Sequence, residues 1–264
     1  MSPTRQLRAE QEPFLTARSL AITYSSGYTI PPHSHGWHQL LYARTGAMTV
    51  FADRMSWMIP PGRAVYIPAQ CKHSIRMWGD VAMRSLYFPA NCRAQALKVT
   101  ECRVIAVTPL LRELILRVVE LAALDSRVES ELHMMSVLMD ELAGAPAGPL
   151  ALPLPVDSRA LAAAMRVLER PADGASLNAL AQQCGVGART LERLFLTETG
   201  MPFGLWRQKA RLLESIRLLV ESRSVTHAAL ESGYSSVSAY IAAFKQTFGC
   251  TPRTFWNSAS IGGV

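Results

Sequence analysis

The stretch SLNALAQQCGVGARTLERLF, residues 176–195, contains two short helical patterns with a turn between them. Ala181 is a small residue inside the first pattern, at the point where a second helix crosses closely. Gly185 follows four residues later, and glycine adopts the backbone conformation of such a turn without strain. Apolar residues then stand where they would lock the two helices together: Leu180, Val186, Leu191, Leu194 and Phe195. The stretch therefore predicts a helix-turn-helix.

The same arrangement recurs at SVTHAALESGYSSVSAYIAAF, residues 224–244, with Ala229 and Gly233 at the same spacing. The repetition weakens the alternative that the first stretch is an ordinary helical hairpin in a bundle. Between the two units, residues 203–222 form a continuous amphipathic pattern that would hold them at a fixed separation. Two such helices on a rigid rod could enter successive major-groove turns on one face of B-DNA. We therefore expect an all-α, DNA-binding domain over residues 157–264.

Side chains that face away from the apolar locks are the expected DNA contacts. In the first unit these are Ala188, Arg189, Glu192 and Arg193, and in the second they are Ser236, Val237, Ser238 and Ile241. The expected contacts to the phosphate backbone are Lys209, Arg211, Lys245 and Arg253. Arginine binds guanine edges and glutamate accepts from cytosine, so we expect the first unit to carry most of the sequence discrimination. Contact with phosphate alone remains the alternative for Arg189 and Arg193.

The first part of the chain has a different pattern. From residue 19 to about residue 88, short apolar runs are broken by glycine and proline, which is typical of a small antiparallel barrel or sandwich. Residues 109–143 then show helical spacing and predict a pair of helices. The stretch GAPAGPLALPLPVD, residues 144–157, has four prolines and two glycines, which exclude a further helix and indicate an interdomain linker. The predicted class is α+β, and its parts are a β-barrel with a helical pair (1–145), a linker (146–156) and the all-α domain (157–264).

Three histidines in the β-rich part are candidate metal ligands. His33 and His35 are two residues apart and would share one face of a strand, while His73 follows in a later run. Such a set suits a divalent metal. Gln39 lies where a carboxylate would be a better ligand, and it brings no charge to offset the dication. A metal site and a metal-free role in a ligand pocket or in the structure both remain open.

Two resemblances give these patterns a context. The segment GYSSVSAYIAAFKQTFGCTP, residues 233–252, closely resembles the signature of the DNA-binding domain of AraC family transcription regulators, a likeness that extends over about residues 157–257. Residues 27–46 and 68–73 resemble the two motifs of the cupin barrel, with Gln39 in place of the usual acidic residue and Gln70 in place of glycine. The resemblance implies a cupin-like sensor of a small-molecule effector, dimerisation through a helix after the barrel, and RNA polymerase as a partner.

The inward positions of the barrel are the expected effector pocket. The candidate lining residues are His33, His35, Trp37, Gln39, Tyr42, Trp57, Tyr66 and His73, and His33, His35 and His73 are the candidate metal ligands. Ordinary core packing is the alternative for each aromatic residue.

The expected function is that of an effector-controlled transcription regulator, provisionally an activator, without catalysis. The alternatives are a metal-dependent cupin oxygenase or isomerase with an appended helical domain, and a DNA-binding protein whose barrel has no ligand. A net charge of +7 favours an anionic partner such as double-stranded DNA. The five cysteines form no C-x-x-C pair, the first residues lack the apolar core of a signal peptide, and no run is long enough to span a membrane, so we expect a cytoplasmic protein.

Overall fold

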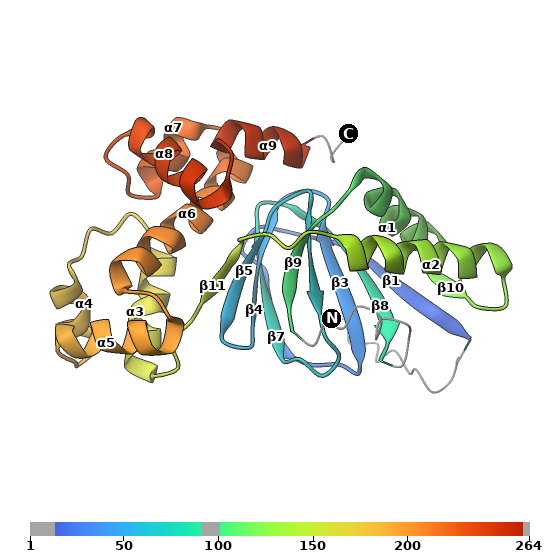
Figure 1. Ribbon diagram of the computed structural model, residues 1–264, viewed down its shortest axis with the longest axis horizontal. Coiled ribbons are helices and arrows are strands. Elements are labelled where there is room, and N and C mark those ends of the chain that lie inside the picture. The colour runs from blue at the N-terminus through green and yellow to red at the C-terminus, as the bar shows by residue number, and fades with distance from the viewer. Residues whose placement is uncertain (1–13, 91–100, 261–264) are drawn as a thin grey trace.

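The computed structural model describes residues 14–90 and 101–260 (Figure 1). The strands are β1 (Leu15–Tyr24), β2 (Thr29–His33), β3 (Trp37–Ala43), β4 (Ala47–Ala52), β5 (Met55–Ile59), β6 (Arg63–Ile67), β7 (His73–Trp78), β8 (Val81–Pro89), β9 (Arg103–Ala106), β10 (Ala123–Asp125) and β11 (Ala151–Pro153). The helices are α1 (Pro109–Leu121), α2 (Glu129–Gly144), α3 (Ser158–Glu169), α4 (Leu177–Gln183), α5 (Ala188–Thr199), α6 (Phe203–Ser222), α7 (Val225–Glu231), α8 (Val237–Phe248) and α9 (Pro252–Ser260). The prediction of a β-rich domain followed by an all-α domain is confirmed.

The strands form two antiparallel sheets, with the orders β10-β1-β8-β3-β6-β9 and β11-β5-β4-β7-β2. Successive side chains of a strand point to opposite faces, and β3 shows the result. Leu41 packs in the cluster between the two sheets, together with residues such as Met48 and Ile75. Leu40 and Tyr42 belong to a second cluster, which is covered by α1 and α2. The first sheet is thus apolar on both faces.

The second sheet packs against the helical domain. Thr49 and Trp78 on its outer face surround a small pocket together with Met165 of α3 and Glu214 of α6. The molecule therefore has four layers in the order α1 and α2, first sheet, second sheet, and α3 with α6, and Figure 1 shows the two helical groups on opposite sides of the strands. Among the described residues, none of the helices combines the length and the apolarity needed to cross a bilayer.

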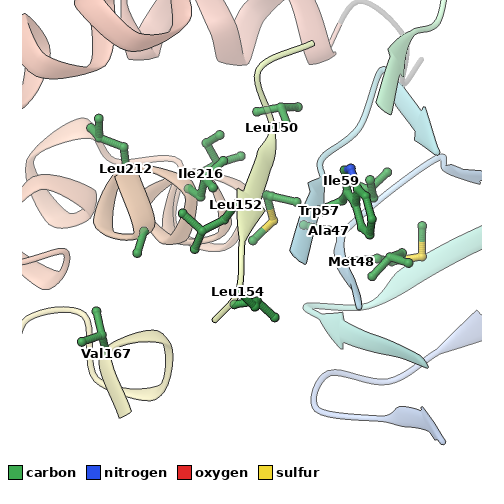
Figure 2. Close-up of a cluster of buried hydrophobic side chains, with 14 of the residues drawn as sticks. Ala47, Met48, Trp57, Ile59, Leu150, Leu152, Leu154, Val167, Leu212 and Ile216 are labelled. Atoms are coloured by element: carbon green, nitrogen blue, oxygen red, sulfur yellow. The ribbon is translucent and has the colours of Figure 1, made fainter. Parts of the chain in front are cut away.

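The segment that we expected to be a linker contains a strand. Its three residues pair antiparallel with β5, with Leu152 opposite Ser56. Leu150, Leu152 and Leu154 alternate along the segment and are all buried. Figure 2 shows Leu152 pointing toward Ile216 of α6, while the strand itself lies beside β5. As predicted, the segment forms no further helix between α2 and α3.

Both predicted helix-turn-helix units are present, as α4 with α5 and α7 with α8. The two turn glycines have positive φ angles, +70° at Gly185 and +84° at Gly233. Ala181 and Ala229 are buried, and each of their carbonyls accepts a hydrogen bond from the residue after the turn glycine, at 3.0 Å in both units. The 20 residues of α6 separate the two units by a rod of about 30 Å. This length is close to one turn of B-DNA, which is about 34 Å.

Candidate nucleic-acid interface and ligand site

Helix α5 is fixed by its apolar face. Leu191, Leu194 and Phe195 are buried, and the Phe195 ring lies edge-on to the rings of Phe203 and Trp206 of α6, with centroids 4.9 Å and 5.0 Å away. The opposite face is left to solvent. Arg189 and Arg193 are exposed there, and neither forms an ion pair with any residue that the structure describes. Both guanidinium groups are free to meet a base edge or a phosphate.

Three of the predicted contact residues have structural partners. Glu192 accepts a hydrogen bond from the backbone N–H of Phe203 at 3.2 Å, at the first residue of α6. Ser236 is the N-cap of α8 and accepts from the N–H of Ala239 at 3.2 Å. The Arg211 guanidinium donates to the carbonyls of Pro171 at 2.7 Å and of Asp173 at 3.1 Å, which ties α6 to the loop between α3 and α4. These side chains contribute to the fold of the domain.

Helix α8 presents a small and apolar face. Ser238 is exposed, while Val237 and Ile241 are half-buried. The buried Tyr240 on the opposite side donates a hydrogen bond from its hydroxyl to Ser215 Oγ of α6 at 3.0 Å, which sets the rotation of the helix. The remaining predicted contacts differ in exposure: Lys245 and Arg253 are exposed, Ala188 and Lys209 are half-buried, and burial lowers the pKa of Lys209.

The three predicted histidines come together at one end of the sheets. The ring centroids of His33 and His73 are 4.3 Å apart, and those of His35 and His73 are 5.3 Å apart. Each Nδ1 lies at hydrogen-bonding distance from a backbone carbonyl: 2.9 Å for His33, 2.8 Å for His35 and 3.0 Å for His73. Because a carbonyl only accepts, these contacts fix the tautomer with a proton on Nδ1 and leave each Nε2 as an acceptor.

The Nε2 atoms and Gln39 form a set of acceptors. His35 Nε2 lies 3.2 Å from Gln39 Oε1, while Gln39 Nε2 donates to Ser85 Oγ at 3.1 Å and to the Tyr87 hydroxyl at 3.2 Å. The Nε2 of His73 is buried and has no hydrogen-bond partner among the described residues. Burial lowers the pKa of His73 to about 4 and also lowers that of His35, so both rings are neutral near pH 7. Neutral imidazoles with convergent lone pairs fit a divalent cation.

The other expected pocket residues separate into two groups. Trp37 and Trp57 are buried residues of β3 and β5, and Trp57 packs in the cluster between the sheets. Tyr42 and Tyr66 belong to the cluster under α1 and α2, so the structure does not bring them together with the histidines. His38 points to the same face as Tyr66, and its Nδ1 lies 2.8 Å from the Tyr66 hydroxyl.

Sequence reasoning missed the two residues that orient Gln39. Ser85 and Tyr87 lie in β8, opposite Leu41 and Gln39 of β3. They alternate along β8 just as Gln39 and Leu41 do along β3, but strand pairing is needed to place them at this site.

Two consecutive helix-turn-helix units behind a β-rich domain define a DNA-binding transcription regulator, and comparison with known proteins agrees. Residues 180–258 match a helix-turn-helix domain family, and residues 19–139 match the AraC-like ligand binding domain. The HTH-type transcriptional regulator NimR of Escherichia coli is 30% identical over 227 residues, which cover 86% of this chain and 82% of NimR. The chain belongs to the AraC family of transcription regulators.

Two further likenesses are more limited. The HTH-type transcriptional regulator RipA of Corynebacterium glutamicum is 39% identical over 103 residues, which cover 39% of this chain and 31% of RipA. Among solved structures, ToxT from Vibrio cholerae O395 aligns over 93% of this chain and 98% of its own, with 11% identity and a TM-score of 0.40.

Proposed function

We propose that this protein is an effector-controlled regulator that reads DNA with α5 and α8 and receives its effector at the histidine end of the sheets, without catalysis. The observation that carries the proposal is the repeated helix-turn-helix on either end of α6. Its exposed arginines, Arg189 and Arg193, lie on a helix whose opposite face is locked in the core. Enzymatic activity of a cupin type is the competing proposal, and it gives the second helix-turn-helix no role.

DNA binding is tested first with the full-length protein. A preferred duplex is selected from a random library, and affinity is measured by fluorescence anisotropy at several salt concentrations, since neutralised phosphates make binding salt-sensitive. We expect Arg193→Ala to weaken binding to the selected site by about 1–3 kcal/mol and to relax the preference at one base pair. Equal weakening on all sequences would assign Arg193 to phosphate contact.

The matched control is Arg117→Ala, an exposed arginine of α1 that pairs with Glu120 on the side of the sheets away from the helical domain. This variant should bind like the unmodified protein. If the full-length protein binds no duplex in a salt-sensitive manner, the proposed function is wrong.

We further propose that the histidine site holds a divalent cation, with the Nε2 atoms of His33, His35 and His73 and Oε1 of Gln39 as ligands. When bound, the cation would provide a positive centre between the sheets for an oxygen-bearing effector. The support is the 3.2 Å approach of His35 Nε2 to Gln39 Oε1, two acceptors that cannot hydrogen-bond to each other in the tautomer described above.

Metal analysis of the purified protein tests this site. We expect His73→Ala to lose the cation and Tyr66→Phe, a change on the opposite face of the sheet, to keep it. Sub-stoichiometric metal, together with a melting temperature that chelators leave unchanged, would leave the histidines as hydrogen-bonding groups for the effector.

The working state that we propose is a cytoplasmic homodimer that contacts RNA polymerase. Exposed apolar side chains on the outer helices offer a surface for the second copy, among them Leu110 of α1 and Leu132 of α2. Sedimentation of the full-length protein measures the oligomeric state, and Leu132→Glu is expected to yield monomers.

A further inference from the structure

A second cluster of metal-ligating atoms shares no residue with the histidine site. Asp53 lies in the turn between β4 and β5, Cys71 in the loop between β6 and β7, and Cys102 directly before β9. One ligand atom from each residue lies within 4.8 Å of the other two. The fold therefore brings a carboxylate and two thiols to one point from three separate segments of the chain.

The distances in this cluster suit a tetrahedral cation. Cys71 Sγ lies 3.1 Å from Asp53 Oδ2 and 3.6 Å from Cys102 Sγ. Zinc holds thiolate sulfur at about 2.3 Å and carboxylate oxygen at about 2.0–2.2 Å, so tetrahedral geometry separates two sulfurs by about 3.8 Å and a sulfur from an oxygen by about 3.6 Å. The Cys71–Cys102 separation is within about 0.2 Å of this geometry, the Cys71–Asp53 separation would have to widen by about 0.5 Å, and the ligand atoms of Asp53 and Cys102 lie within 4.8 Å of each other.

The backbone around the cluster is well defined. Asp53 and Arg54 have φ angles of 45° and 62°, which is the left-handed conformation of a tight hairpin turn and orients the Asp53 carboxylate. The carbonyl of Cys71 faces His73 Nδ1 at 3.0 Å, and its N–H donates to Pro68 at 3.3 Å. Cys102 is only 8% exposed.

The cluster would also need a counter-charge. Two thiolates and the Asp53 carboxylate would repel one another at these separations, and a bound cation supplies the positive charge that stabilises them together.

We propose that Asp53, Cys71 and Cys102 form a binding site for a thiolate-preferring divalent cation of the zinc type, with a fourth position open to solvent. The proposal goes beyond the proposed function and does not depend on it. The neighbouring Arg54 carbonyl accepts the N–H of Leu154 at 2.8 Å, at the end of the segment that joins the two domains. Occupancy would therefore fix the turn on which this segment ends.

Cobalt(II) is the probe for the experiment, since thiolate ligands give cobalt an intense near-ultraviolet charge-transfer absorption that imidazole ligands do not. The reduced full-length protein is titrated with cobalt and then with competing zinc. We expect the band in the unmodified protein and its loss in both Cys71→Ser and Cys102→Ser. Asp53→Asn should keep the band but bind zinc about tenfold more weakly.

Two matched controls separate this site from the rest of the chain. Cys184→Ser changes a half-buried cysteine of the helical domain and should keep the band, and His33→Ala should also keep it even where it lowers total metal content. Circular dichroism and thermal unfolding check that each variant is folded. If a cysteine variant fails to fold, Asp53→Asn, which retains both thiols, carries the test.

Three results would overturn the proposal. The first is the absence of a thiolate band in the reduced, unmodified protein. The second is a band that survives both cysteine substitutions. The third is a Cys71–Cys102 disulfide that forms, on peptide mapping, while zinc is in excess.

Discussion

Adjacent side chains on α5 have different surroundings, although their positions in the sequence pattern are equivalent. Arg193 is exposed, whereas Glu192 accepts the N–H of Phe203 at the start of α6. The N-cap of α6 is Pro202, which has no side-chain acceptor, so Glu192 satisfies an N–H that would otherwise lack a partner. Sequence reasoning grouped the two because both face away from the apolar locks, and the partner that separates them lies 11 residues further along the chain.

We predict that Glu192→Ala lowers the free energy of unfolding by about 1 kcal/mol, the usual loss for a helix cap. Urea denaturation measures this change, and repeated DNA selection measures base preference. Preference should stay the same, because the carboxylate is engaged by α6. A variant with unchanged stability and an altered preference at a cytosine would instead place Glu192 at the DNA.

Glu214 of α6 gives a pH prediction at the domain interface. Its side chain is 7% exposed and lies 3.1 Å from Arg217, and burial, only partly offset by this arginine, raises the pKa of Glu214 above the ordinary 4.5. Between these two pKa values the folded state keeps a proton that the unfolded state has lost, so the free energy of unfolding falls as pH rises through this window.

Glu214→Gln cannot ionise, so it should remove this decline and make the protein more stable than the unmodified chain above the window. Urea midpoints measured from about pH 4 to about pH 8 test the prediction. Glu221→Gln is the control, because Glu221 is exposed and pairs with the same arginine. If the slopes of the unmodified protein and Glu214→Gln coincide, Glu214 does not control the pH dependence.

Among the elements, the helix-turn-helix units were the most predictable, because their constraints lie within about 20 residues of sequence. The small residue, the turn glycine and the apolar locks are all local requirements, and both units satisfy them in the structure.

The two turn glycines nevertheless differ in their surroundings. A Cβ at Gly233 would meet Ala172 Cα at 3.0 Å and the Pro171 carbonyl at 3.2 Å, whereas a Cβ at Gly185 would meet nothing within 4 Å.

We therefore predict that Gly185→Ala lowers the free energy of unfolding by about 1–2 kcal/mol, because alanine is strained in the left-handed backbone conformation. Gly233→Ala should cost more, because a backbone atom must also move. Thermal unfolding of the two variants side by side gives the comparison. Equal losses of stability in the two variants would mean that the loop after α3 can move away from the new Cβ without a measurable penalty.

The pocket and the linker were predicted less well, for two different reasons: the local pattern could have prevented the first error but not the second. Tyr42 differs in strand parity from Gln39, so the alternation rule alone would have placed it on the other face. In the linker, Leu150, Leu152 and Leu154 recur at the period of a strand, but the four prolines masked that signal. Its partner, the edge of β5, is almost 100 residues earlier and cannot be inferred from local pattern.

On the scale of the whole molecule, the segment that joins the two domains packs against both of them. Its leucines belong to a single buried cluster that includes residues between the sheets and residues of α6. Trp206 of α6 donates from Nε1 to the carbonyl of Pro153 at 2.6 Å, and Glu198 of α5 accepts the N–H groups of Val156 and Asp157. The segment is therefore packed and hydrogen-bonded to α5 and α6 on one side and paired with β5 on the other.

We predict that Leu152→Ala lowers the free energy of unfolding by about 2–5 kcal/mol, because it leaves a cavity between β5 and α6. It should also speed proteolytic cleavage in the joining segment, which is followed by mass spectrometry. Val156→Ala in the same segment is the control, since Val156 is exposed. Similar cleavage rates for the two variants would show that the domains are held together by other contacts.

The pairing of β11 with β5 also covers a strand edge that could otherwise pair with a strand of another molecule. If these three residues detached, the N–H and C=O groups along the edge of β5 would face solvent, and an exposed strand edge is a template for strand addition between molecules. Pairing with β11 therefore keeps this edge of the second sheet covered. Because Leu152 and the Pro153 carbonyl in the same strand also contact α6, uncovering this edge would break contacts in both domains at once.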